Sequence, residues 1–199
     1  MTRSKLILAS KSKARQEMLR NAGFDFEIKS ADIDERQLEV NMKKNGANFE
    51  DIALGLAKEK ALYVSGKEKD SFVVGSDQIL IFNSEIISKA NNTQQAYERL
   101  KSFRANSHTL ISSVAVARNG SIEWHETGQA KLTMRDFSDD FLNYYIADAR
   151  DILTSCVGCY ALEQKGIQLF EKIDGDYFTI LGMPLLPLIG YLQKEGLGL

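Results

Sequence analysis

Near the N-terminus the sequence reads Leu6-Ile7-Leu8-Ala9-Ser10-Lys11-Ser12-Lys13-Ala14-Arg15, and this stretch decides the fold. Its apolar start predicts a short buried strand, and the apolar spacing that follows predicts a helix. Ser10 and Ser12 are both suitable N-caps for that helix. With Ser12 as the cap, Lys11, Lys13 and Arg15 crowd the positive end of the helix dipole, at a cost of roughly 0.3–1 kcal/mol each. An anion bound there would remove the conflict, so the stretch is read either as a phosphate site or as a solvated basic turn.

Length and charge restrict the class of protein. The chain has 199 residues, enough for one sizeable core, and we interpret 1–199 as a single domain. Its formal net charge of −2 argues against a non-specific nucleic-acid binder, so we expect a small polyanion and no nucleic acid as partner. We find neither a signal-peptide pattern nor a membrane-spanning run, which predicts a cytoplasmic protein without a membrane partner.

Cys156 and Cys159 form the only C-x-x-C pair. This spacing occurs in zinc sites and in redox dithiols. Zinc usually needs four ligands, and His108 and His125 are not spaced as a second pair. We therefore favour packed thiols.

The remaining pattern mixes helices with strands. Helices are predicted at 48–65, 93–103, 138–148 and from Pro184, and strands at 24–28, 109–117, 122–134 and 167–173, with two further strand-like runs within 71–82. Asn119-Gly120 is a strong hairpin signal. Hairpins together with crossovers predict an α/β fold with a mixed sheet flanked by helices.

Asp77 is an acidic residue between those two strand-like runs. An ionised carboxylate in a core strand needs a metal, a cation or a cleft, so we regard Asp77 as a candidate site residue. Lys60 borders the apolar face of the predicted helix 48–65, where a lysine that reaches solvent is the simpler explanation. The acidic stretch 31–36, which includes Glu35, is expected to be a short loop.

Several motifs together resemble the Maf family of nucleoside triphosphate pyrophosphatases along essentially the whole chain. They occur in the family's order, and they are Leu-Ile-Leu-Ala-Ser-x-Ser-x-x-Arg ending at Arg15, Asp34-Glu35, Lys60-Ala61, Gly75-Ser76-Asp77, Ser88-Lys89, Gly158-Cys159-Tyr160, Asp174-Gly175-Asp176-Tyr177 and Leu181-Gly182-Met183-Pro184-Leu185. The proline that follows the family's lysine is absent after Lys89. The resemblance implies an elongated mixed sheet with two lobes around a central cleft.

The resemblance also implies a reaction: metal-dependent hydrolysis of a nucleoside triphosphate to a monophosphate and pyrophosphate. Asp77 would be the catalytic base, and Glu35 and Asp77 would hold Mg²⁺ or Mn²⁺, which prefer hard oxygen ligands. Substrate-binding residues would be Ser10, Ser12, Arg15, Lys60, Gln78, Lys89 and Glu163. A nucleoside triphosphate is the expected partner, and a homodimer is left open.

Two positions indicate which nucleotide is bound. The branch of the family that acts on dTTP and UTP usually has arginine where this chain has Ala14 and glutamine where it has Glu163. Ala14, Glu163 and the sequence Gly-Ser-Asp-Gln around Asp77 are similar to the branch that hydrolyses 7-methyl-GTP. A carboxylate at 163 could accept hydrogen bonds from guanine N1–H and the N2 amine. The alternatives are a dTTP/UTP pyrophosphatase and a non-catalytic nucleotide-binding regulator of cell division.

Overall fold

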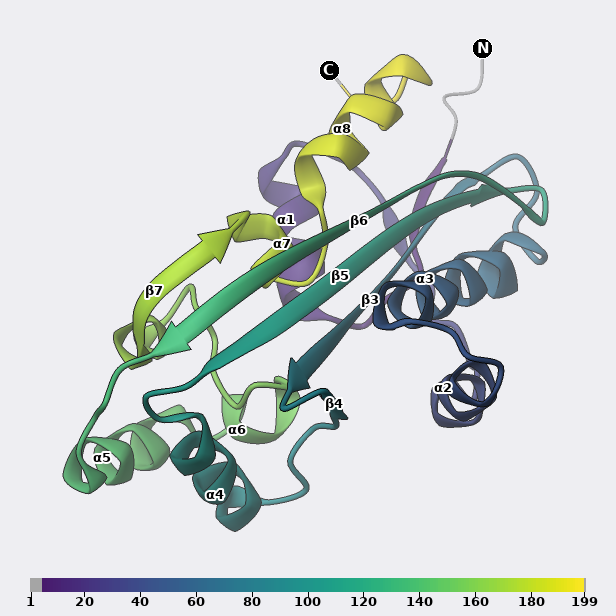
Figure 1. The fold of residues 1–199 in the computed structure, drawn as a ribbon. Helices are drawn as coiled ribbons and strands as arrows, with labels where there is room; N and C mark the ends of the chain where they lie inside the picture. The colour runs from purple at the N-terminus through teal and green to yellow at the C-terminus, as the bar shows by residue number, and fades with distance from the viewer. Residues whose placement is uncertain (1–4, 199) are drawn as a thin grey trace. The chain divides into compact units, whose positions relative to one another are not determined.

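The computed structural model describes residues 5–198 and has a mixed α/β fold, as predicted (Figure 1). The strands are β1 Leu6–Leu8, β2 Glu27–Ile28, β3 Phe72–Phe82, β4 Glu85–Ile87, β5 Ser107–Arg118, β6 Ser121–Met134 and β7 Phe170–Gly175. The helices are α1 Lys13–Asn21, α2 Glu35–Lys44, α3 Phe49–Ser65, α4 Thr93–Phe103, α5 Asp139–Ala149, α6 Ile152–Ser155, α7 Tyr177–Ile180 and α8 Leu185–Lys194, with a 3₁₀ turn η1 at Lys165–Leu169.

The seven strands form one sheet with the order β2-β1-β3-β5-β6-β7, and β4 pairs with β3. β1 is parallel to β2 and to β3, whereas β3–β4 and β6–β7 are antiparallel, so the predicted mixed sheet is confirmed. The chain divides into two compact units. Unit 1 is 1–78, 111–128 and 177–199, and unit 2 is 79–110 and 129–176. The expected cleft between two lobes stays a prediction.

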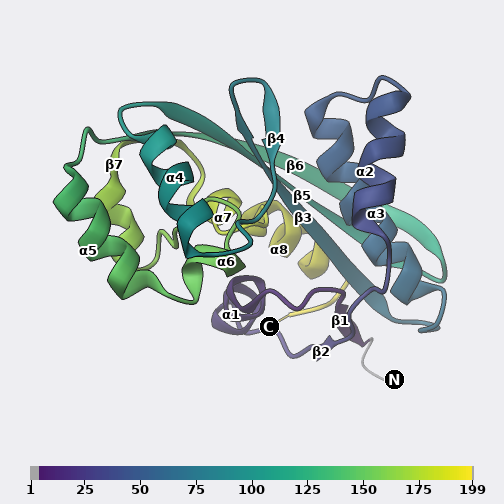
Figure 2. The same cartoon turned by 90° about the horizontal axis from the view of Figure 1, so that it is seen from below.

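Unit 1 has a helical layer on each face of its strands, because strand side chains alternate between the faces. Even-numbered residues of β1, β3 and β5 pack with α1 and α8 in one cluster, which includes Leu8, Val74 and Leu188. Odd-numbered residues face α3, where Ala57 and Ala61 pack on Ala115 and Ala117. Figure 2 shows α1 and α3 on different sides of β3. The two residues that follow Gly75 in β3 are therefore directed to opposite layers.

Local capping explains where the two helices next to β3 begin. The Ser12 side chain accepts a hydrogen bond from the Arg15 backbone N–H, so Ser12 is the N-cap of α1. α3 begins with a reciprocal capping box between Asn48 and Asp51. Both starts agree with the sequence analysis.

Four local predictions differ from the structure. The expected strand 24–28 is reduced to β2, and the expected strand 167–173 is η1 followed by β7. Residue 166 lies in η1 and packs on the Ala161 backbone. Glycine fits there, because an added Cβ at Gly166 would lie 2.5 Å from the Ala161 carbonyl oxygen. The two runs around Asp77 are one continuous strand, β3. The acidic loop instead ends at the Asp34 N-cap of α2, whose first residue is Glu35.

Unit 2 contains an aromatic cluster around a buried histidine. The His108 side chain is 2% exposed and stacks on Phe103, with ring centroids 4.8 Å apart. Its Nε2 lies 2.6 Å from the Tyr160 hydroxyl oxygen, and its Nδ1 has no hydrogen-bond partner among the described residues. Burial lowers the pKa of His108 to about 4, because the apolar surroundings disfavour the imidazolium.

This histidine predicts a loss of stability in acid. Between an unfolded pKa near 6.5 and a folded pKa of about 4, the unfolded chain binds a proton that the folded chain does not. The free energy of unfolding should therefore fall as the pH drops through this window, by about 3 kcal/mol in total. Urea unfolding at pH 7.5 and pH 4.5 measures the loss. His108→Gln, which cannot titrate, should lose less, and an equal loss in both proteins would contradict the prediction.

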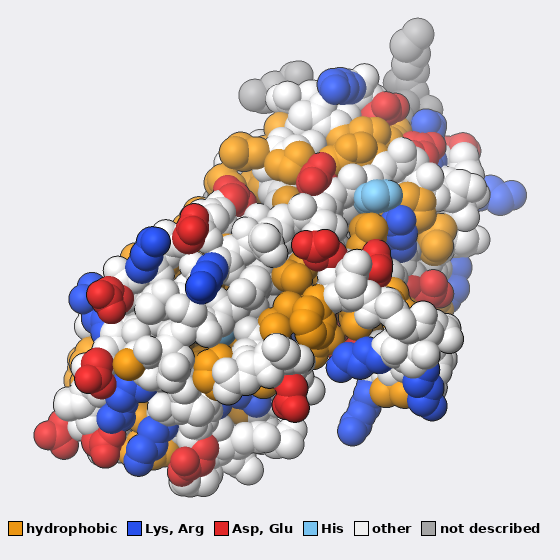
Figure 3. Space-filling view, in the orientation of Figure 1, with side chains coloured by type: hydrophobic (Ala, Val, Ile, Leu, Met, Phe, Trp, Pro, Cys, Tyr) orange, Lys and Arg blue, Asp and Glu red, His pale blue; other side chains and the backbone are white. Residues whose placement is uncertain are grey.

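On the face shown in Figure 3, acidic and basic side chains are mixed, in keeping with the formal net charge of −2. Among residues 5–198, no helix is both long enough and apolar enough to cross a membrane.

Candidate functional site

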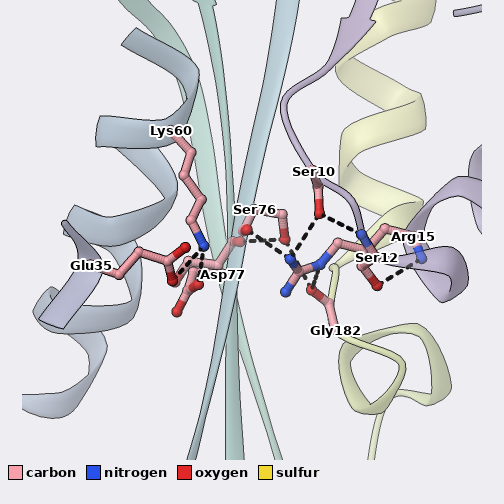
Figure 4. A network of polar contacts seen from close by, with 9 residues as sticks. Ser10, Ser12, Arg15, Glu35, Lys60, Ser76, Asp77 and Gly182 are labelled. Atoms are coloured by element: carbon pink, nitrogen blue, oxygen red, sulfur yellow. Dashed lines mark hydrogen bonds and ion pairs between the residues drawn. The ribbon is translucent and has the colours of Figure 1, made fainter. Parts of the chain in front are cut away.

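The candidate site is built on both faces of β3. Side-chain alternation directs Ser76 toward the α1 layer and Asp77 toward α3. Figure 4 shows Lys60 and Glu35 on the Asp77 side of the strand, and Ser10, Arg15 and Gly182 on the Ser76 side. All of these residues belong to unit 1.

On the α3 side, one ammonium group bridges two carboxylates. Lys60 Nζ lies 2.6 Å from Asp77 Oδ1 and 2.9 Å from Glu35 Oε2. The side chains of Lys60 and Asp77 are each 11% exposed, whereas the Glu35 side chain is 53% exposed. The lysine therefore turns into the site, and the expectation that it reaches solvent is wrong.

The position of Lys60 depends on a close approach of α3 to β3. A Cβ added to Gly75 would lie 2.3 Å from the Ala57 carbonyl oxygen and 2.5 Å from the Ala61 backbone nitrogen. Only glycine permits this separation. Because Lys60 lies between Ala57 and Ala61 on α3, the same contact brings its ammonium within reach of Asp77.

Burial and charge act in opposite directions on Asp77. Desolvation raises the pKa of this carboxyl above its ordinary value, while the charges of Lys60 and Arg15 oppose that rise. A carboxylate with a raised pKa is a better proton acceptor. The role of Asp77 as the catalytic base stays a prediction.

On the other side of β3, Arg15 joins three segments of the chain. Its Nε donates to the Gly182 carbonyl at 2.9 Å, and its Nη1 donates to the Ser76 carbonyl at 2.9 Å and to Ser10 Oγ at 3.3 Å. Burial lowers the pKa of Arg15, against the charges of Asp77 and Glu35. Its Nη2 has no hydrogen-bond partner within residues 5–198, so it remains able to bind an anion.

The serines of the opening stretch lie at the start of α1. Ser10 Oγ accepts from the Ser12 backbone N–H at 3.2 Å and from Arg15, and Ser12 Oγ caps the helix. Neither hydroxyl donates a hydrogen bond to another described residue. The first backbone N–H groups of any helix also lack intrahelical acceptors. The N-terminus of α1 therefore presents donors to an anion.

Gln78 has a fixed amide orientation. Its Nε2 donates to Ser112 Oγ at 3.0 Å and to the carbonyls of Thr179 and Ile180 at 3.1 and 2.9 Å. Because backbone carbonyls only accept, a reversed amide would lose both of those bonds. The role of Gln78 in substrate binding stays a prediction.

Lys89 and Glu163 lie in unit 2, and both are exposed. Both are close to Cys156. Burial raises the pKa of the Cys156 thiol, the Glu163 charge adds to that rise, and the Lys89 charge opposes it. The structure thus brings Lys89 and Glu163 near one thiol, while their approach to the residues of unit 1 stays a prediction. Cys159 is buried and Cys156 is partly buried, as expected for packed thiols.

The residues fit a divalent cation that is only partly held by protein. Glu35 and Asp77 already converge on one cation, the Lys60 ammonium. Within residues 5–198, no group of three or more His, Cys, Asp or Glu could enclose a metal. Mg²⁺ is commonly held by one or two carboxylates, with water and substrate phosphates completing its shell. The carboxylates of Glu35 and Asp77 are enough for this kind of Mg²⁺ binding.

The sequence motifs include Ser76 and Gly182, but they gave no role to the Ser76 side chain or to the Gly182 carbonyl. The Ser76 hydroxyl donates to the carbonyls of Ser113 and Gly182 at 2.8 and 2.9 Å. The bond to Gly182 holds the turn after α7 against β3, and the bond to Ser113 joins β3 to β5. Gly182 has a φ of +107°, which favours glycine, so the Gly-Met-Pro sequence was the available signal.

The site can now be compared with known proteins. The model for the family described as Maf-like protein matches residues 5–195. A nucleoside triphosphate pyrophosphatase of Granulibacter bethesdensis is 47% identical over 191 residues, which cover 96% of this chain and 97% of the relative. A 7-methyl-GTP pyrophosphatase of Brucella suis is also 47% identical over 191 residues, with 96% of each chain covered. On this evidence the chain belongs to the Maf family.

Proposed function

We propose that this chain is a nucleoside triphosphate pyrophosphatase, a hydrolase that cleaves its substrate into a nucleoside monophosphate and pyrophosphate. The observation that carries the proposal is the buried Asp77, whose carboxylate shares the Lys60 ammonium with Glu35. The names of the curated relatives support the same activity.

The charges of the site suit a triphosphate. Such a substrate carries about four negative charges near neutral pH. Arg15 can offer its Nη2 donors, which have no partner within residues 5–198, and Ser10 and Ser12 can position phosphate oxygens at the start of α1. Lys60 and, by the family resemblance, Lys89 supply further positive charge as compact ammonium groups.

Asp77 is proposed to orient a water molecule and accept its proton. The water oxygen forms a bond to phosphorus as the anhydride bond between the α and β phosphates breaks. In attack at the α phosphorus, pyrophosphate leaves with that bond's electron pair, and in attack at the β phosphorus, the nucleoside monophosphate does. Attack at the α or the β phosphorus gives the same two products. A divalent cation bound by Glu35 and Asp77 would lower the pKa of a bound water and offset phosphate charge.

We propose 7-methyl-GTP as the preferred substrate. Ala14 leaves out the arginine that is typical of the dTTP/UTP branch, and Glu163 can accept from the guanine N1–H and N2 amine. The positive charge of a methylated guanine also favours a carboxylate. Several relatives, including those of Brucella suis and Rhizobium etli, are named 7-methyl-GTP pyrophosphatases, and this supports the choice.

An assay of pyrophosphate release over 7-methyl-GTP, GTP, dTTP and UTP with Mg²⁺ or Mn²⁺ tests both parts of the proposal. We expect release from 7-methyl-GTP to exceed release from dTTP and UTP. Faster release from dTTP or UTP would favour the other branch. Binding of a nucleotide with no release from any would favour a non-catalytic regulator.

Glu163→Gln tests the recognition of the base. Loss of the carboxylate should lower the ratio of kcat/KM for 7-methyl-GTP to that for dTTP by about ten-fold, because hydrogen bonds to a charged group are stronger than neutral ones. Glu171→Gln is the matched control, since Glu171 is an exposed residue of β7 in the same unit. An unchanged substrate ranking in Glu163→Gln would remove this residue from base recognition.

A further inference from the structure

The Lys60 ammonium occupies the position that a cation shared by Glu35 and Asp77 would take. Its Nζ is within 2.9 Å of an oxygen from each carboxylate. Mg²⁺ binds oxygen at about 2.1 Å, so an ion that contacts both oxygens must lie between them. The ammonium and the metal therefore cannot bind this pair of oxygens at the same time.

The charges of the cluster are already balanced without a metal. Glu35 and Asp77 provide two negative charges, and Lys60 and Arg15 provide two positive ones. Arg15 makes no ion pair within the described part of the chain, but its charge interacts with both carboxylates. Asp77, Lys60 and Arg15 are all buried, so their charges are poorly screened by water. A divalent cation that enters this cluster alone adds two positive charges without compensation.

A bound triphosphate changes both the contacts of the Lys60 ammonium and the charge balance of the cluster. Its oxygens offer Lys60 an alternative acceptor, and its negative charges compensate the metal. We propose that Lys60 excludes a divalent cation from the Glu35–Asp77 pair until the nucleotide arrives, so that the cation enters together with the triphosphate. This inference rests on the proposed metal-dependent reaction. It adds the order in which the components assemble and the residue that enforces that order.

The test measures Mn²⁺ binding to the protein without nucleotide, from the electron paramagnetic resonance signal of free Mn²⁺ at pH 8. Wild-type protein should bind Mn²⁺ weakly. Lys60→Met removes the competing charge and should lower the Kd for Mn²⁺ by at least about ten-fold. Lys60→Gln keeps a hydrogen-bond donor for Asp77 without the charge, should shift the Kd in the same direction, and decides the test if Lys60→Met does not fold.

Lys58→Met is the matched control. Lys58 lies two residues away on α3, and its substitution changes the net charge of the protein equally without altering the contacts of Asp77. It should bind Mn²⁺ like wild type. If Lys58→Met raises the affinity for Mn²⁺ as much as Lys60→Met does, the proposal is overturned. It is also overturned if folded Lys60→Met or Lys60→Gln binds Mn²⁺ no more tightly than wild type.

The same titration is then repeated with a triphosphate analogue that cannot be hydrolysed. Wild-type protein should now retain Mn²⁺ together with the analogue, and the difference in Mn²⁺ binding between wild type and Lys60→Gln should shrink. A difference that persists unchanged overturns the proposed order. Since none of these measurements needs turnover, they separate this inference from the proposed activity, which fails only if no nucleotide yields pyrophosphate.

Discussion

Asp77→Asn is expected to reduce pyrophosphate release by about 10²–10⁴-fold, the range that a positioned general base contributes. Asparagine has nearly the same shape and can still accept a hydrogen bond from Lys60 Nζ, which lies 2.6 Å from Asp77 Oδ1 in the wild-type protein. It cannot take a proton from water, and its neutral amide is a poorer ligand for a divalent cation. Steady-state release of pyrophosphate at saturating nucleotide and metal measures the loss in kcat.

The control for this substitution is Asp70→Asn. Asp70 lies just before β3, is exposed and has a φ of +58°, a conformation that asparagine also tolerates. The Asp70→Asn substitution removes the same charge from the same part of the chain without changing the contacts of Lys60. We expect wild-type kcat for Asp70→Asn, and circular dichroism should show both variants folded. Full pyrophosphate release by Asp77→Asn with metal present would show that Asp77 is not the base.

Much of this site could be predicted because its signals are local. The polar residues after Ala9 indicate a strand followed by a helix, and the Ser12 hydroxyl is a local capping signal that the structure confirms. The Asn119-Gly120 turn was equally clear, since both residues have positive φ and join β5 to β6. Such features depend on a few neighbouring residues, so one sequence is sufficient to find them.

The parts that sequence reasoning missed depend on contacts between distant residues. No helix was predicted at α2, whose first two residues belong to the expected acidic loop 31–36, and none of its residues is buried, so it has no clear apolar stripe. Lys60 borders an apolar face, and only the register of α3 against β3 shows that it meets Asp77. The Gly182 carbonyl is a backbone group 167 residues from Arg15, and no side-chain pattern identifies it as an acceptor.

Gly75 sets the distance between α3 and β3, and with it the contact between Lys60 and Asp77. Its missing Cβ lets α3 approach β3 until Ala57 and Ala61 touch the strand. The atoms that a new Cβ would meet are mostly helix backbone, which cannot rotate away as the end of a side chain can. A methyl group at Gly75 must therefore push α3 and β3 apart. Because Lys60 lies between the two contact residues on α3, its ammonium moves with the helix and its contact with Asp77 lengthens.

Gly75→Ala is accordingly expected to lower both stability and activity. Overpacking of this kind costs about 1–3 kcal/mol in the free energy of unfolding, measured by urea denaturation. A shift of about 1 Å in a positioning element can cost about 10²-fold in rate, so kcat for pyrophosphate release should fall well beyond what partial unfolding explains. Gly190→Ala is the matched control: Gly190 is inside α8, and an added Cβ meets nothing within 4 Å. That change should raise stability by about 0.5–1 kcal/mol and leave kcat unchanged. If Gly75→Ala kept wild-type kcat, the close approach of α3 to β3 would not be what positions Lys60 against Asp77.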